Sequence, residues 1–176
     1  MNSGNLSIRH ATIADAETIA EISRQTFFDT FAAYNTEADM QKFLNEQFTK
    51  GRLMLEVGKP ENIFLLAYNN NSIAGYAKIR DGKKPDELKN VDAIEIARLY
   101  VIKQMIGTGA GSALMQHAID IATQQKKEVV WLSVWEHNHR AINFYTRWGF
   151  EKFGECDFLL GDDVQRDWMM KKILLK

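Results

Sequence analysis

Three glycines alternate with other residues in the segment QMIGTGAG, at positions 107, 109 and 111. The apolar run AIEIARLYVI precedes this segment, and the helix-like sequence SALMQHAIDIA follows it. A helix N-terminus leaves backbone N–H groups unpaired and carries partial positive charge, so it binds phosphate well. Glycines in the turn before the helix let the backbone approach an anion without Cβ clashes. The spacing therefore predicts a site for a phosphate-bearing cofactor.

Two common nucleotide-binding patterns do not fit these glycines. A Walker loop requires Gly-x-x-x-x-Gly-Lys-Ser/Thr, and no lysine lies at the start of the following helix. A Rossmann fingerprint requires Gly-x-Gly-x-x-Gly, and the third glycine position holds Ser112 or Leu114, depending on the starting glycine. Glu136 resembles the ribose-binding acid of that fold. However, a dinucleotide fold normally begins with this unit, whereas here the unit follows an antiparallel hairpin.

The first half of the chain predicts the elements that lie before this segment. LSIRHA alternates like a short strand, and the cap pair Thr12 and Asp15 opens a helix. Thr36 opens a second helix, and RLMLEV is a third short helix or its continuation. NIFLLAY and SIAGYAKIR then flank asparagines 69–71, which is typical of an antiparallel hairpin with a tight turn.

The second half predicts alternating strands and helices around the glycines. VDAIEIARLYVI is a strand, and the near-continuous apolar run VVWLSVW indicates a strand buried on both faces. Asn138 opens a last helix that Gly149 ends, and two closing strands follow. The order predicts one domain over residues 5–175, of the α/β (α+β mixed sheet) class, with a central mixed sheet of about seven strands flanked by helices.

Composition limits the classes of protein that the chain can represent. Its 176 residues suit a single domain, and 22 Lys and Arg balance 23 Asp and Glu, without the basic excess of a nucleic-acid binder. Cys156 is alone, which indicates a reducing compartment. The N-terminus has no apolar signal-peptide core, and no apolar run reaches the ~18 residues of a membrane span. We expect a cytoplasmic protein that binds neither membrane nor nucleic acid.

Two motifs resemble those of a known family. Gln104-x-x-Gly107-x-Gly109, after Leu99-Tyr100-Val101, resembles the acetyl-CoA signature of the GNAT acyltransferases. Asn138-x-x-Ala141-x-x-x-Tyr145-x-x-x-Gly149 resembles their second signature at the expected distance. The resemblance implies the GNAT-like acyl-CoA N-acyltransferase fold, acetyl-CoA as co-substrate and no metal. The cofactor-binding residues that it implies are Leu99, Tyr100, Val101, Gln104, Met105, Ile106, Gly107, Thr108, Gly109, Ala110, Gly111, Asn138 and Tyr145.

Acetyl transfer to an amine requires a base, stabilisation of the carbonyl oxygen and stabilisation of the departing thiolate. By resemblance, Tyr145 points its hydroxyl at the CoA sulfur; the alternative is a core aromatic. The resemblance also places backbone N–H groups near Tyr100 or Val101 at the carbonyl, next to a strand bulge. Glu95 is the candidate general base, acting through water; the alternatives are an ion pair with Arg98 or a surface acid.

Several other polar residues have a simple structural explanation. Helix capping accounts for Asn138, which the family also uses to touch the cofactor. Packing at the helix start can account for Gly111. His137 and His139 do not form a metal site, because no further His or Cys joins them. Cys156 has no expected role, because direct transfer needs no enzyme nucleophile.

A wider similarity points to the acceptor. WLSVWEHNHRAINFYTRWGF, GDDVQRD and TFFDTFAAYNT are similar to the PaiA-type branch, whose members acetylate spermine and spermidine. The resemblance implies a small-molecule primary amine as acceptor, and it allows a homodimer, for which no decisive interface signal is visible. Another amine (a protein N-terminus, a lysine or an aminoglycoside) and a non-catalytic acyl-CoA-binding module are the alternatives. Residues expected to flank a polycation are Asp29, Tyr34, Glu37, Asp162 and Asp163.

Overall fold

The computed structural model describes residues 5–174, so the predicted domain end at residue 175 lies outside the described residues. The strands are β1 (Leu6–His10), β2 (Asn62–Asn69), β3 (Ser72–Arg80), β4 (Ala93–Val101), β5 (Val129–Trp135), β6 (Glu151–Leu160) and β7 (Asp163–Ile173). The helices are α1 (Ala16–Phe31), α2 (Glu37–Gln47), α3 (Lys50–Val57), α4 (Ala110–Gln124) and α5 (His139–Arg147).

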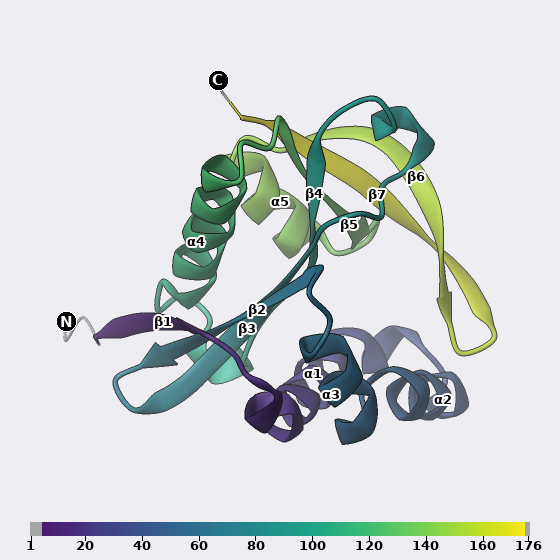
Figure 1. Ribbon diagram of the computed structural model, residues 1–176. Helices are drawn as coiled ribbons and strands as arrows, with labels where there is room; N and C mark the ends of the chain where they lie inside the picture. Colours follow the sequence, from purple (N-terminus) through teal and green to yellow (C-terminus); the bar gives the residue numbers. More distant parts are fainter. Residues whose placement is uncertain (1–4, 175–176) are drawn as a thin grey trace.

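The seven strands form one mixed sheet in the order β1-β2-β3-β4-β5-β7-β6. Helices α4 and α5 lie on one side of the sheet and α1 to α3 on the other, as Figure 1 shows. Neighbouring strands are antiparallel except β4 and β5, which are parallel because α4 connects them. The predicted fold class and element order are confirmed. Within residues 5–174, no helix has both the length and the apolar character needed to cross a bilayer.

The two central strands diverge, and this divergence opens the sheet. β4 and β5 pair only from Ala93 with Val129 to Glu95 with Trp131. A register shift follows in the β3–β4 ladder, where Lys78 faces Arg98 and the next residue of β3 faces Ile96. Such a bulge bends the strand that carries it and increases its twist. The last residues of β4 therefore have a partner on the β3 side only.

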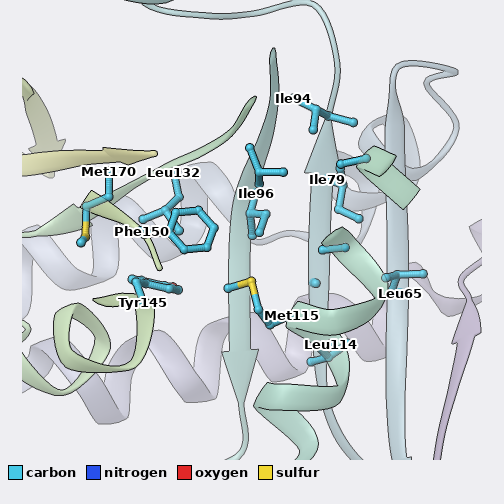
Figure 2. Close-up of a cluster of buried hydrophobic side chains, with 14 of the residues drawn as sticks. Leu65, Ile79, Ile94, Ile96, Leu114, Met115, Leu132, Tyr145, Phe150 and Met170 are labelled. Atoms are coloured by element: carbon cyan, nitrogen blue, oxygen red, sulfur yellow. The ribbon is translucent and has the colours of Figure 1, made fainter. Parts of the chain in front are cut away.

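Each side of the sheet has its own apolar core. Figure 2 shows the core on the α4 and α5 side, where Leu114 and Met115 pack against strand residues such as Ile96 and Leu132. Tyr145 belongs to the same cluster, beside Phe150 and Met170. The other core joins α1, α2 and α3 to the opposite face of the sheet, around Phe27, Phe48 and Tyr76.

Local capping signals explain most element boundaries. The Thr49 hydroxyl accepts a hydrogen bond from the Arg52 N–H at 3.2 Å, so RLMLEV belongs to a separate third helix. Thr12 and Asp15 form the predicted cap, but a short 3₁₀ turn follows it and α1 begins at Ala16. β5 is buried as predicted except at Ser133, which is exposed where the strands diverge, and at Trp135, which is partly buried.

Candidate active site

Three adjoining pockets form one cleft where β4 and β5 diverge. The central pocket has a volume of about 190 Å³ and is lined by α1, the end of β4, β5, α5 and β7. It shares Val101, Arg140 and Tyr145 with a pocket at the glycine turn. It shares Thr26, Trp135 and Asn138 with a pocket beside α1. The cleft therefore connects the two sides of the sheet through the gap between β4 and β5.

The glycine turn gives one end of this cleft its shape. Gly107 and Gly109 have φ angles of +86° and +92°, a conformation that favours glycine. The first backbone hydrogen bond of α4 runs from the Ala113 N–H to the Gly109 carbonyl. The N–H groups of the three residues between them are therefore left without an intrahelical acceptor, as at any helix start. An anionic group bound at this turn can accept hydrogen bonds from these N–H groups.

The predicted cofactor residues divide into two groups. Those that line the cleft are Leu99, Tyr100, Val101, Ile106, Gly107, Gly109, Gly111, Asn138 and Tyr145. Gln104, Met105, Thr108 and Ala110 lie in the same turn but do not line these pockets. The Thr108 hydroxyl donates to the Met105 carbonyl at 2.7 Å and so stabilises the turn itself. A contact of this hydroxyl with a phosphate stays a prediction.

The open edge of β4 presents backbone donors to the cleft. The Ile102 N–H donates to Ala74 of β3 at 2.9 Å. Successive N–H groups of a strand point to opposite edges, so the N–H groups of Val101 and Leu99 point away from β3. β5 does not pair with this part of β4. Val101 therefore offers a free N–H next to Tyr145, whereas the side chain of Tyr100 is buried against Tyr76 on the other face.

Tyr145 is buried, yet its hydroxyl lies at the cleft. Its side chain is 9% exposed and lines both the central pocket and the glycine-turn pocket. Within residues 5–174 the hydroxyl makes no hydrogen bond. Burial raises the pKa of Tyr145 to about 12, so the hydroxyl stays protonated at neutral pH. The ring belongs to the core and the hydroxyl remains available, so both interpretations of this residue hold.

Glu95 occupies a different environment from the one predicted. Its carboxylate is 5% exposed, accepts a hydrogen bond from the Arg80 Nε at 2.7 Å and lines none of the three pockets. Arg98, the expected partner, binds Glu56 of α3 at 2.8 Å instead. Glu95 is therefore neither a surface acid nor a partner of Arg98. A route through water from Glu95 to the acceptor stays a prediction.

Of two residues on helix starts, Asn138 has the structural role that the sequence suggested, whereas packing does not require a glycine at position 111. The Asn138 side chain accepts from the Ala141 N–H at 3.2 Å, so it caps α5, and it also lines the central pocket. A Cβ on Gly111 would lie 3.5 Å from the Val101 Cγ2 atom, which is ordinary contact. Gly111 has no positive φ, unlike Gly107 and Gly109, so neither its backbone conformation nor its packing requires a glycine.

The sequence analysis missed three charged residues in the cleft. Arg140 and Arg147 of α5 line the glycine-turn pocket, where their positive charge suits phosphate. Asp167 of β7 is 6% exposed and lines the central pocket with Tyr145. Helical periodicity around Tyr145 places Arg140 and Arg147 on α5, but no local pattern separates Asp167 from the other polar residues of its strand.

Aromatic residues, acids and cations surround the outer end of the cleft, where Lys103 and Arg140 line the pocket beside α1 and Arg166 lines the pocket at Asp163. Trp135 contacts the rings of Phe31 and Tyr34 edge to face, at 5.6 Å and 5.2 Å between ring centroids. Asp29 and Tyr34 line the pocket beside α1, and Asp163 lines a neighbouring pocket at Trp135. The two other acids expected at this end, Asp162 and Glu37, line none of these pockets; Asp162 instead pairs with Lys42 of α2 at 2.5 Å.

Potential metal ligands do not gather in the part of the chain that the structure describes. No three or more His, Cys, Asp or Glu side chains within residues 5–174 form a group that could hold a metal ion. His137 and His139 are exposed at the start of α5, and His137 lies 3.7 Å from Glu136.

Comparisons with known proteins agree with this arrangement. Residues 17–150 match the Acetyltransferase (GNAT) family. An uncharacterized N-acetyltransferase in the pepI 3′ region of Lactobacillus delbrueckii subsp. lactis is 38% identical over 88% of the chain and 89% of the relative. Spermidine N(1)-acetyltransferase of Thermoplasma acidophilum is 24% identical over 96% of the chain and 97% of the relative.

The structural comparison gives the same fold. The crystal structure of PaiA N-acetyltransferase from Thermoplasma acidophilum in complex with coenzyme A superimposes with a TM-score of 0.81 and 22% identity, over 97% of the chain and 99% of that structure. Together with the family match, the glycine turn at the start of α4 and the gap between β4 and β5, this shows that the chain belongs to the GNAT family of N-acetyltransferases, which use acetyl-CoA.

Proposed function

We propose that the protein transfers the acetyl group of acetyl-CoA to a primary amine of a polycation such as spermidine, by direct attack of the amine on the thioester. The observation that carries the proposal is the outer end of the cleft. Tyr34 is 68% exposed there and stands against Trp135, beside Asp29 and Asp163. Aromatic faces and carboxylates both attract alkylammonium groups.

The opposite end of the cleft suits the cofactor. The pyrophosphate of CoA fits the free N–H groups at the start of α4, with Arg140 and Arg147 as nearby cations. The pantetheine arm then runs along the open edge of β4 and uses Leu99 and Val101 as hydrogen-bonding partners. Asn138 faces the arm from the start of α5. This path brings the thioester into the central pocket.

The central pocket supplies two groups to the reaction. The Val101 N–H is positioned for the thioester oxygen, on which negative charge grows as the amine attacks. The Tyr145 hydroxyl is positioned for the sulfur, which leaves as a thiolate. Acetyl-CoA supplies the acetyl group, and this chain orients the thioester and excludes water around it. A relative named as a spermidine N(1)-acetyltransferase and a structural neighbour in complex with coenzyme A support the proposed acceptor and cofactor.

A panel of amines, scored by release of free CoA thiol, tests the proposal. Spermidine and 1,6-diaminohexane are compared with hexylamine, which has the same alkyl length as the diamine but no second charge. We expect kcat/KM to be at least about tenfold higher for the two polycations, because the second ammonium reaches the acids and Tyr34. A preference for hexylamine would reject the polycation, and thiol release at the amine-free rate with every amine would reject the transferase.

A further inference from the structure

Asp167 is a buried carboxyl whose burial the fold does not explain. It lies on β7, across from Trp135 of β5 on one side and Cys156 of β6 on the other. Its side chain is 6% exposed, and its Oδ1 atom is buried without a hydrogen-bond partner within residues 5–174. An unpaired carboxylate oxygen away from water is unfavourable. A carboxyl in this state indicates that a ligand from outside the chain binds to it.

The cations around Asp167 are engaged elsewhere or lie apart from it. Arg98 lines the same pocket but binds Glu56 at 2.8 Å. Arg166, the preceding residue of β7, lies 3.2 Å from Glu155. Arg140 lines the pocket from α5 and forms no ion pair with Asp167. The pocket therefore holds a carboxyl without a counter-ion.

Most of the remaining polar groups near Asp167 are acids or uncharged side chains. They are Ser133 on β5, Glu136 just after β5, Cys156 and Asp157 on β6, Glu95 and Tyr100 on β4, Tyr145 on α5, and Thr26 and Thr30 on α1; the cation Lys83 acts on the neighbouring Cys156. Burial raises the pKa of Asp167, a hydrogen bond with Ser133 lowers it and the charge of Glu136 raises it, so that the pKa is about 6. The carboxyl is thus mostly ionised at pH 7.5, but it binds a proton more tightly than an exposed aspartate does.

We infer that Asp167, which lines the central pocket, is the residue that receives the acceptor amine: its carboxylate binds the reacting ammonium and takes its proton. The inference rests on the proposed function and names the base of that reaction. Asp167, Tyr145 and Val101 line the same pocket. An amine bound at Asp167 is therefore adjacent to a thioester held at Val101 and Tyr145.

The protons of the reaction can be accounted for with these groups. The ammonium gives one proton to the Asp167 carboxylate, which passes it to solvent through the open cleft. The neutral nitrogen then forms a bond to the thioester carbon, and the carbon–sulfur bond breaks. The second proton leaves the nitrogen as the amide forms and ends on the sulfur of CoA, beside the Tyr145 hydroxyl. The products are the acetylated amine, CoA thiol and one proton in solvent.

The test is the pH dependence of kcat/KM for the amine, from pH 5 to 9, in wild type and variants. Wild type should show an inflection near pH 6, because kcat/KM reports the free enzyme. Asp167→Asn should lose the inflection and about 10²- to 10⁴-fold in kcat/KM at pH 7.5. Asp167→Glu should recover part of both. Asp120→Asn, an exposed aspartate on α4, is the matched control and should behave as wild type.

The outcomes separate this inference from the proposed function. If wild type is active and Asp167→Asn keeps the inflection and the rate within about threefold, the inference fails and the transferase stands. If Glu95→Gln loses the inflection and Asp167→Asn keeps it, the base is Glu95. If wild type acetylates no amine, the proposed function fails. Spermidine binding, measured by calorimetry in the presence of CoA, then tests the role of Asp167 by itself. Equal affinity of wild type and Asp167→Asn for spermidine would overturn the inference too. Acetyl-CoA binding and a thermal melt confirm that each variant folds.

Discussion

The Tyr145 hydroxyl is better suited to stabilise the departing sulfur than to give up its proton. Burial raises the pKa of Tyr145 to about 12, whereas an alkyl thiol has a pKa of about 8.5, so full transfer is unfavourable by several pKa units. We predict that Tyr145→Phe lowers kcat about 100- to 1,000-fold, as removal of one positioned donor does, with the dissociation constant of acetyl-CoA within about twofold. Steady-state kinetics and calorimetry measure the two quantities. An unchanged kcat would leave Tyr145 as a core aromatic only.

Asp167 also affects stability, with a definite sign. Its folded pKa of about 6 lies above the ordinary value of 3.8, so the ionised form destabilises the folded state above pH 6 and the effect disappears below pH 4. Asp167→Asn should therefore raise the free energy of unfolding more at pH 7.5 than at pH 4.5, by about 2 kcal/mol. Urea unfolding at the two pH values, with Asp120→Asn as control, measures this difference. Equal effects of the substitution at both pH values would show that burial does not raise the pKa of Asp167.

The glycine turn and the start of α4 allow a matched comparison at the level of one element. Gly109 has a φ of +92°, and a Cβ there would lie 3.2 Å from the Leu6 Cδ1 atom. Gly109→Ala should lower the free energy of unfolding by about 1–2 kcal/mol, because an L side chain is strained in this conformation, and should weaken CoA binding. Gly111→Ala has ordinary φ and contacts and should not destabilise the fold. Equal losses of stability in the two variants would contradict this explanation.

Local signals predicted most elements, because caps and turns depend on neighbouring residues. Asn70 has a φ of +56° in the predicted hairpin turn, and Asn138 caps α5. The candidate site was less predictable, because its base depends on strands far apart in the sequence. Glu95 faces Arg80 only through the register of β3 and β4. Asp167 reaches the cleft only because β7 follows β5 in the sheet, and the sequence of β7 carries no sign of this order.

Within residues 5–174, the two larger apolar cores meet along the divergent strands β4 and β5. One core is under α4 and α5 and the other under α1 to α3 (Figure 1). The cleft passes between them through the gap. A cofactor that pairs with the open edge of β4 would complete the sheet and connect both cores. Binding should then stabilise the entire fold rather than the glycine turn alone.

Hydrogen exchange with and without CoA tests this coupling. The Leu99 and Val101 N–H groups face the unpaired edge of β4, whereas the N–H of Tyr100 points to β3. We predict that saturating CoA slows exchange at Leu99 and Val101 and leaves Tyr100 nearly unchanged. CoA at 100 times its dissociation constant should also raise the free energy of unfolding by about 2.7 kcal/mol. The Gly109→Ala variant, at the same CoA concentration, should show smaller effects on both. If CoA protected the turn before α4 without slowing Leu99 or Val101, the pantetheine arm would not pair with β4 and the thioester would lie elsewhere in the cleft.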